Sequence, residues 1–217
     1  MINFLPRLIS GILYILIIFT SIIISKESFL FVFSLLALVS TNEAYLLYKK
    51  MKKNGYKFKN FITPHLYVFI SMIALIYIPF AHSFTYDPYK ILFIFLMIWI
   101  TDTMSYFFGS YYGKNKLNIK ASPNKTWEGL IGGIFCSFIF SIVSFYFIKE
   151  VYPLWKTILL GLTIPLFGLF GDTQQSEFKR AAEVKDSGNL IPGHGGLFDR
   201  LDSAIGNSFI ILIITIF

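Results

Sequence analysis

Residues 130–148 read LIGGIFCSFIFSIVSFYFI, a stretch without a charged side chain. A helix needs about 20 consecutive apolar residues to cross the roughly 30 Å hydrocarbon core of a bilayer. Backbone groups in that core must bond to one another, so a continuous apolar run favours a helix over an open sheet. The segment therefore predicts a membrane-spanning helix.

Six further apolar runs extend this pattern over the chain. They lie at residues 8–25, 29–48, 61–80, 91–108, 157–170 and 201–217. Only 14% of the 217 residues are charged, against about 25% in soluble domains. Neither a repeat nor a linker divides the chain, and the first run follows Arg7 without a small-residue cleavage site. We expect a single all-α domain over residues 1–217, a polytopic transmembrane bundle of about seven helices whose first helix is retained.

The basic residues predict the orientation of this bundle. Lys and Arg are enriched in cytoplasmic loops, and seven crossings from a cytoplasmic N-terminus leave only Lys26, Lys90, Lys149 and Lys156 on the opposite side. The other basic residues are Arg7, Lys49, Lys50, Lys52, Lys53, Lys57, Lys59, Lys114, Lys116, Lys120, Lys125, Lys179, Arg180, Lys185 and Arg200. We therefore expect a multi-pass membrane protein whose basic loops face the cytoplasm. The net charge of +7 favours anionic lipid headgroups, and not nucleic acid, as the partner of these short loops.

One segment concentrates charge and glycine between two apolar runs. Residues 171–203 read GDTQQSEFKRAAEVKDSGNLIPGHGGLFDRLDS. If the preceding helix continues, Asp172, Ser176 and Lys179 share one of its faces. Asp199 and Asp202 stand one turn apart, and the glycines between can free backbone N–H groups for phosphate. The segment predicts an active site at the cytoplasmic membrane surface.

The residue types in this segment suit a nucleotide carried by a metal ion. Mg²⁺ binds through one or two carboxylates together with substrate phosphates, and Asp172, Asp199 and Asp202 are the candidate ligands. The neighbouring cations that would stabilise moving phosphate charge are Lys179, Arg180, Lys185 and Arg200. The alternative is a solvated loop whose charges pair with each other. The density of charge beside a membrane span favours the site.

A second group of candidates precedes the run at 130–148. Asp102 sits near the end of an apolar run, where an ionisable residue marks a functional site unless it only caps or pairs locally. Residues 122–129 read SPNKTWEG, in which Ser122 and Lys125 are candidate binding residues. Gly132 and Gly133 permit close helix packing.

Two further residues have a functional and a structural interpretation. Glu43, near the end of the second run, is a weaker candidate, and the favoured alternative is an interfacial carboxylate with no catalytic task. His194 lies in charged company, yet its glycine neighbours fit a structural turn equally well.

These motifs resemble the phosphatidate cytidylyltransferase family, also called CDP-diacylglycerol synthases. The matching residues are Ser176, Lys179-Arg180, Lys185-Asp186, residues 192–196 (PGHGG) and Asp199-Arg200-Leu201-Asp202, together with residues 122–129 and 102–113. The resemblance covers roughly the second half of the chain. Gln175 departs from it, since many members carry Glu there, and the chain is shorter than many relatives.

The resemblance implies transfer of CMP from CTP to phosphatidate, giving CDP-diacylglycerol and pyrophosphate for phospholipid biosynthesis, with Mg²⁺ as cofactor and a homodimer among the partners. It assigns catalytic roles to Asp172, Ser176, Lys179, Asp199 and Asp202, with metal binding by the three aspartates. Substrate-binding roles fall to Asp102, Ser122, Lys125, Arg180, Lys185, Asp186, His194 and Arg200. The alternatives are activation of another lipid phosphate with the same chemistry, and a non-catalytic membrane transporter or scaffold.

Overall fold

Seven α-helices make up most of the described part of the chain. The computed structural model describes residues 4–55, 63–82, 84–190 and 195–217, with side chains from residue 9 onward. The helices are α1 (Phe4–Ile24), α2 (Lys26–Lys53), α3 (Pro64–Tyr77), α4 (Pro88–Tyr111), α5 (Trp127–Ile148), α6 (Leu154–Ala181) and α7 (Phe198–Ile216), with a 3-10 turn, η1 (Ile78–Phe80), after α3. The described ranges contain no strand, only one bridge between Lys116 and Thr126. The predicted all-α bundle of seven helices is confirmed.

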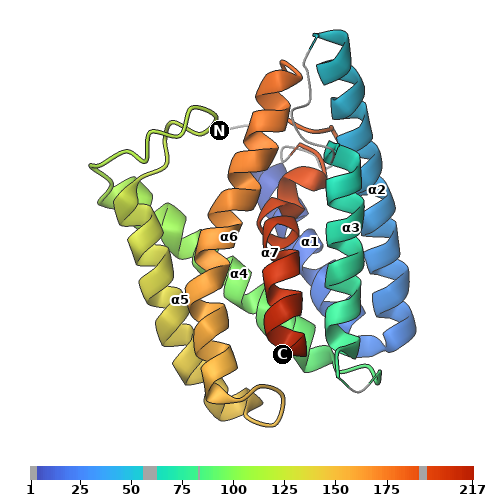
Figure 1. Ribbon diagram of the computed structural model, residues 1–217, viewed down its shortest axis with the longest axis vertical. Helices are drawn as coiled ribbons and strands as arrows, with labels where there is room; N and C mark the ends of the chain where they lie inside the picture. The colour runs from blue at the N-terminus through green and yellow to red at the C-terminus, as the bar shows by residue number, and fades with distance from the viewer. Residues whose placement is uncertain (1–3, 56–62, 83, 191–194) are drawn as a thin grey trace.

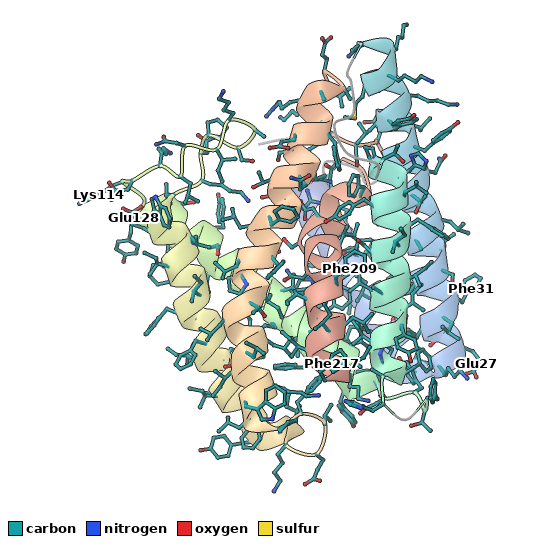
Figure 2. All side chains as sticks on the ribbon, viewed as in Figure 1. Glu27, Phe31, Lys114, Glu128, Phe209 and Phe217 are labelled. Atoms are coloured by element: carbon teal, nitrogen blue, oxygen red, sulfur yellow. The ribbon has the colours of Figure 1, made fainter. Side chains whose placement is uncertain are left out.

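The helices have the length and surface of a membrane protein. Four of them, α2, α4, α5 and α6, are long and apolar enough to cross a bilayer. Two shorter apolar helices lie at Ile9–Ile24 and Pro64–Phe80. Large apolar side chains point outward, such as Phe31, which is 72% exposed on α2 (Figure 2). Exposed apolar surface on this scale marks contact with lipid.

Helix α6, which carries Asp172, Ser176 and Lys179, continues beyond its apolar part. The run at 157–170 predicts a membrane span, whereas α6 extends to Ala181 and has Lys179 and Arg180 in its last turn. Hydropathy marks where a helix leaves the bilayer and not where its hydrogen bonding stops, which explains the shorter prediction. Because the helix continues, Asp172, Ser176 and Lys179 share one face as expected.

The loops that carry the motifs gather at one end of the bundle. In Figure 1, α6 and α7 lie side by side at the centre, with α5 on one flank, α2 and α3 on the other, and α4 running obliquely behind α6 and α7. The α4–α5 connection (residues 112–126) and the described parts of the α6–α7 connection (residues 182–190 and 195–197) lie at the same end as the C-terminus of α2. The basic loops therefore share one end of the molecule, as the orientation argument requires.

Glycines bring α6 and α7 into backbone contact near this end. A Cβ atom at Gly171 would lie 2.5 Å from the carbonyl oxygen of Asp202 and 2.6 Å from Cα of Gly206. Such approach is possible only without side chains at both positions. Asp172, the next residue on α6, is thereby held close to the first turns of α7. The predicted close packing at Gly132 and Gly133 is also present, against Phe108 and Ser105 of α4.

This contact predicts the effect of a single methyl group on stability. Gly171→Ala should destabilise the protein by about 1–3 kcal/mol, because the new Cβ meets backbone atoms that cannot move aside. Gly168→Ala, one turn away on α6, is the matched control, since its Cβ would lie 3.1 Å from the side-chain amide of Asn207 and no backbone atom is among its near neighbours. Thermal unfolding in detergent measures both variants. Equal midpoints would contradict the assigned contact.

Candidate active site

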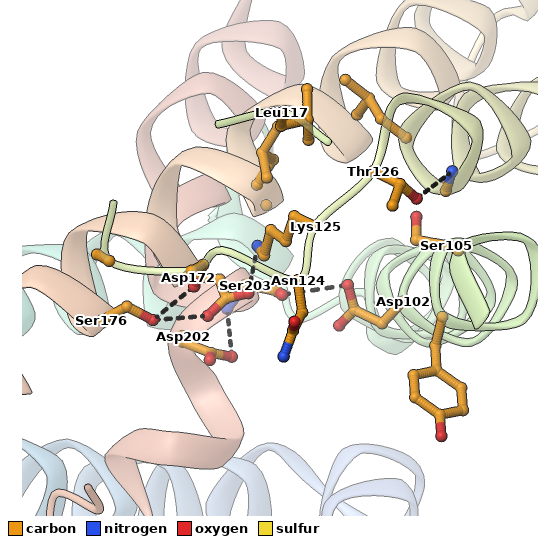
Figure 3. A pocket seen from close by; sticks show the side chains of 18 of the residues that line it. Asp102, Ser105, Leu117, Asn124, Lys125, Thr126, Asp172, Ser176, Asp202 and Ser203 are labelled. Atoms are coloured by element: carbon orange, nitrogen blue, oxygen red, sulfur yellow. Dashed lines mark hydrogen bonds and ion pairs between the residues drawn. The ribbon is translucent and has the colours of Figure 1, made fainter. Parts of the chain in front are cut away.

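One large pocket opens at the motif-bearing end of the bundle. Its volume is about 860 Å³, and its walls come from α4, α5, α6, α7 and the two connecting loops. Acidic, basic and hydroxyl side chains converge on it from these separate elements (Figure 3). The pocket is large enough for a nucleotide-sized ligand, and its polar lining suits a charged one.

The α4–α5 connection closes over the pocket through an ion pair. Lys125 of this loop pairs with Asp172 of α6. Beside the pair, the Ser122 hydroxyl donates to Ser176 Oγ at 3.1 Å, and the Ser176 hydroxyl reaches Asp172 Oδ1 at 3.5 Å. The loop and the helix thus meet through the residues that the two motifs contributed.

Three carboxylates from three helices face one another across the pocket. Asp102 of α4, Asp172 of α6 and Asp202 of α7 surround it (Figure 3). Burial disfavours the charged form of Asp202, and the other two carboxylates add electrostatic repulsion. Asp102 accepts a hydrogen bond of 3.2 Å from the hydroxyl of Ser203, while Asp202 accepts one of 2.8 Å from the Ser203 backbone N–H. Concentrated negative charge with few paired cations is a suitable environment for a divalent cation.

Asp199 has different surroundings. Its Oδ1 accepts hydrogen bonds from Lys179 Nζ at 2.8 Å and Gln175 Nε2 at 3.2 Å. Its Oδ2 accepts from the Ser187 N–H at 2.8 Å, the Ser187 hydroxyl at 3.0 Å and the Gly196 N–H at 3.0 Å. Five donors occupy this carboxylate, which joins α6, the α6–α7 loop and the first turn of α7.

The charge of Asp199 is stabilised by these donors. Burial alone would raise the pKa of its carboxyl, but the hydrogen bonds from Lys179 and from the backbone of Ser187 and Gly196 outweigh burial and lower the pKa below its usual value. Asp199 is therefore an ionised anchor for the loop.

The structure places twelve of the thirteen predicted site residues on the pocket wall. They are Asp102, Ser122, Lys125, Asp172, Ser176, Lys179, Arg180, Lys185, Asp186, Asp199, Arg200 and Asp202. His194 lies outside the described residues, as do Pro192 and Gly193 of the glycine motif. Residues separated by up to a hundred positions thus meet at one site, and their individual roles stay predictions.

Four backbone N–H groups around the glycine motif already bond to protein carboxylates. The N–H groups of Ser187 and Gly196 donate to Asp199, and those of Leu197 and Phe198 donate to Glu43. The prediction that loop N–H groups bind phosphate also concerns residues 191–194, which lie outside the described residues, and it stays a prediction.

Several polar residues near the site were not among the predicted site residues, and Glu43 was rated only a weak candidate. Ser187, Ser203, Gln175 and Ser105 bond to the predicted carboxylates or line the pocket. Gln175 is 1% exposed and its amide reaches Asp199. The helical spacing Asp172, Gln175, Ser176, Lys179 carried a signal for Gln175, because these positions share a face. Ser203 and Ser105 had no comparable signal.

The residues present fit a magnesium site that substrate completes. No group of three or more His, Cys, Asp or Glu side chains in the described part of the chain is arranged to hold a metal ion unaided. Mg²⁺ commonly takes one or two carboxylates and the phosphates of its nucleotide. Asp172 and Asp202 meet that requirement, whereas Asp199 would have to release donors to join them.

The fold and the pocket define a multi-span helical membrane protein with a polar site that suits phosphate and metal chemistry. Residues 5–217 match the profile of the Cytidylyltransferase family. The chain belongs to this family.

Curated relatives carry a more specific name. The phosphatidate cytidylyltransferase of Staphylococcus aureus (strain COL) is 40% identical over 179 residues, covering 79% of this chain and 65% of the relative. The enzyme of the same name from Staphylococcus saprophyticus is 36% identical, covering 77% of this chain and 64% of the relative. That from Staphylococcus haemolyticus is 37% identical over 167 residues. The chain thus spans slightly less than two thirds of the length of the relatives it matches.

The different surroundings of Asp199 and Asp202 predict opposite effects on stability. Asp199→Asn should lower the free energy of unfolding by roughly 1–3 kcal/mol, because the amide turns a donor toward N–H groups that need an acceptor. Asp202→Asn should leave stability unchanged or raise it, because it removes repulsion from Asp102 and Asp172. Thermal unfolding of the two variants in detergent tests this. A larger loss in Asp202→Asn would overturn the assignment.

Proposed function

We propose that the protein transfers CMP from CTP to phosphatidate and releases pyrophosphate, forming CDP-diacylglycerol. The observation that carries this proposal is the pocket in which Asp102, Asp172 and Asp202 converge beside Lys125 and Lys179. The named activity of its relatives supports it. Acidic residues for a metal and cations for phosphate, at one end of a membrane bundle, suit a reaction between a soluble nucleotide and a lipid.

The proposed reaction is a displacement at the α-phosphorus of CTP. A phosphate oxygen of phosphatidate forms a bond to this phosphorus, and the bond from the phosphorus to the oxygen bridging the α- and β-phosphates breaks. The bond electrons leave with pyrophosphate. Because the lipid phosphate is already an anion, it needs no strong general base, and a protein of this kind acts mainly by positioning and charge stabilisation.

Mg²⁺ is the proposed cofactor, and it would supply charge neutralisation for the triphosphate and the departing pyrophosphate. Asp172 and Asp202 would hold it, with the remaining positions filled by substrate oxygens. Asp199, named with them as a ligand from the sequence, is better suited by its five hydrogen bonds to fix Lys179 and the loop. This refines the predicted ligand set of Asp172, Asp199 and Asp202.

The basic side chains on the wall would bind the phosphates of both substrates. Lys125 and Lys179 are paired with Asp172 and Asp199 in the structure. The Lys125–Asp172 pair is partly exposed, so an arriving phosphate or metal can exchange with it. The Lys179–Asp199 pair is largely buried and would hold Lys179 in place before substrate binds. Arg180, Lys185 and Arg200 lie farther toward solvent on the same wall and suit the entering triphosphate. Ser122 and Ser176 are the proposed orienting hydroxyls.

The membrane setting follows from the same geometry. We propose that the pocket faces the cytoplasm across the inner membrane of a bacterium, since the basic loops gather at its end of the bundle. CTP would then enter from the cytosol, while phosphatidate keeps its acyl chains in the bilayer. We also propose a homodimer, and this part of the proposal is based on the family resemblance alone.

A related enzyme that activates another lipid phosphate would use the same site. The names of the curated relatives favour phosphatidate, and competition between lipid phosphates for the purified protein separates the two. The polar side chains of the described pocket cluster at one end of the bundle, which disfavours a transporter.

The function predicts that the pocket carboxylates are required for turnover. Purified protein supplied with CTP, phosphatidate and Mg²⁺ should form CDP-lipid and pyrophosphate, and Asp172→Asn or Asp202→Asn should lower kcat at least about 100-fold while the protein remains folded. Glu27→Gln on the far end of α2 is the matched control and should retain activity. Full activity of both aspartate variants would contradict the metal assignment, and inactive wild-type protein would contradict the function.

A further inference from the structure

Glu43 of α2 is a buried carboxylate that binds the segment around the glycine motif. It is 6% exposed. Its Oε1 accepts a hydrogen bond of 3.0 Å from the Leu197 N–H, and its Oε2 accepts bonds of 2.9 Å from the Phe198 N–H and from the Ser187 hydroxyl. Two of these donors open α7, where backbone N–H groups lack helical partners and a negative charge is favourable. Glu43 therefore acts as the acidic cap of α7, supplied by a helix more than 150 residues earlier.

Ser187 links Glu43 to the pocket. Its hydroxyl lies 2.9 Å from Glu43 Oε2 and 3.0 Å from Asp199 Oδ2. Its backbone N–H also donates to Asp199 at 2.8 Å. Since a hydroxyl has one proton, it donates to one carboxylate at a time, and the position of this single side chain is set by both.

The chain closes around Glu43 because two positions lack side chains. A Cβ at Gly188 would lie 2.6 Å from Glu43 Oε1, and one at Gly196 would overlap Glu43 Oε2 and Ser187 Oγ. The glycines that the sequence places in this loop thus leave room for the carboxylate. This close fit restricts where the loop can sit relative to α2.

The hydrogen bonds that begin at Glu43 lead to Lys179, a cation on the pocket wall. Asp199, held by Ser187 and Gly196, accepts from Lys179 Nζ at 2.8 Å. Lys179 is on the last turns of α6 and lines the pocket with Asp172 and Asp202. Glu43, Ser187, Asp199 and Lys179 form a continuous chain of hydrogen bonds from the interior of the bundle to the site.

We propose that Glu43, acting through Ser187, is a positioning residue for the transfer reaction: it fixes the α6–α7 loop so that Asp199 holds Lys179 where the phosphates bind. Glu43 itself is not among the residues that line the pocket. This inference rests on the proposed function, since the positioning is of value to that reaction.

Glu43→Gln tests the proposal without changing side-chain size. The amide turns a donor toward N–H and O–H groups that need an acceptor, so the loop should shift, and misplacement of a site by about 1 Å can cost roughly 100-fold in rate. We expect kcat at saturating CTP and lipid to fall at least about 10-fold while the thermal midpoint shows a folded protein. Glu27→Gln is the matched control on the same helix. Wild-type kcat in Glu43→Gln would overturn the proposal.

Ser187→Ala distinguishes positioning from general stabilisation. It should also lower kcat, and the double variant Glu43→Gln/Ser187→Ala should lose little more than the stronger single variant, because both act through one chain. If the fold-loss of kcat in the double variant equals the product of the two single losses, Glu43 does not act through Ser187. If Glu43→Gln does not fold, Ser187→Ala decides alone, since wild-type kcat in that variant contradicts the proposal.

Hydrogen exchange separates this inference from the proposed function. The amides of Leu197 and Phe198 should be protected in the wild-type protein and exchange at least about 10-fold faster in Glu43→Gln, with the core of α5 unchanged. This holds even if the wild-type protein makes no CDP-lipid, in which case the proposed function fails while the contact stands. Unchanged exchange at both amides would overturn the positioning role whatever the activity.

Discussion

Five donor atoms of α6 and the α6–α7 loop lie within hydrogen-bonding distance of the Asp199 carboxylate, and the geometry of the pocket depends on it. It fixes the ammonium of Lys179, the turn at Ser187 and the backbone at Gly196. A buried charge is tolerated only when its acceptor sites are filled, so the loop must keep this form while Asp199 stays ionised. Without this interaction the loop would have no fixed relation to the end of α6.

The same electrostatic constraint separates the neighbouring aspartates by role. Asp199 and Asp202 stand three positions apart at the start of α7, yet one is filled by donors and the other is repelled by two carboxylates. A carboxylate whose oxygens already accept hydrogen bonds stabilises the local structure. A carboxylate that is repelled by its neighbours is stabilised when it binds a cation. The repulsion on Asp202 depends on the contact between α6 and α7 at Gly171 and Gly206. This contact holds Asp172 and Asp202 close together.

Much of the fold was predictable because hydropathy and helical periodicity are local signals. The seven helices followed from apolar runs, and the shared face of Asp172, Ser176 and Lys179 followed from their spacing. The end of α6 was not predictable from hydropathy, since its polar last turns remain helical outside the apolar span. Glu43 was a weak candidate because its partners lie about 150 residues away, and the sequence does not show that Leu197 and Phe198 need an acceptor there. Ser187 and Ser203 were missed for the same reason, since serines are common in loops and carry no distinctive spacing.

In the proposed reaction, this pocket joins the α-phosphate of CTP to a lipid phosphate. Phosphorus NMR of CTP incubated with the purified protein, Mg²⁺ and phosphatidate in detergent follows the fate of each phosphate directly. If the proposed reaction takes place, the α-phosphorus appears in a lipid diphosphate while the β- and γ-phosphates leave together as pyrophosphate. Release of the γ-phosphate alone, with formation of CDP, would contradict it.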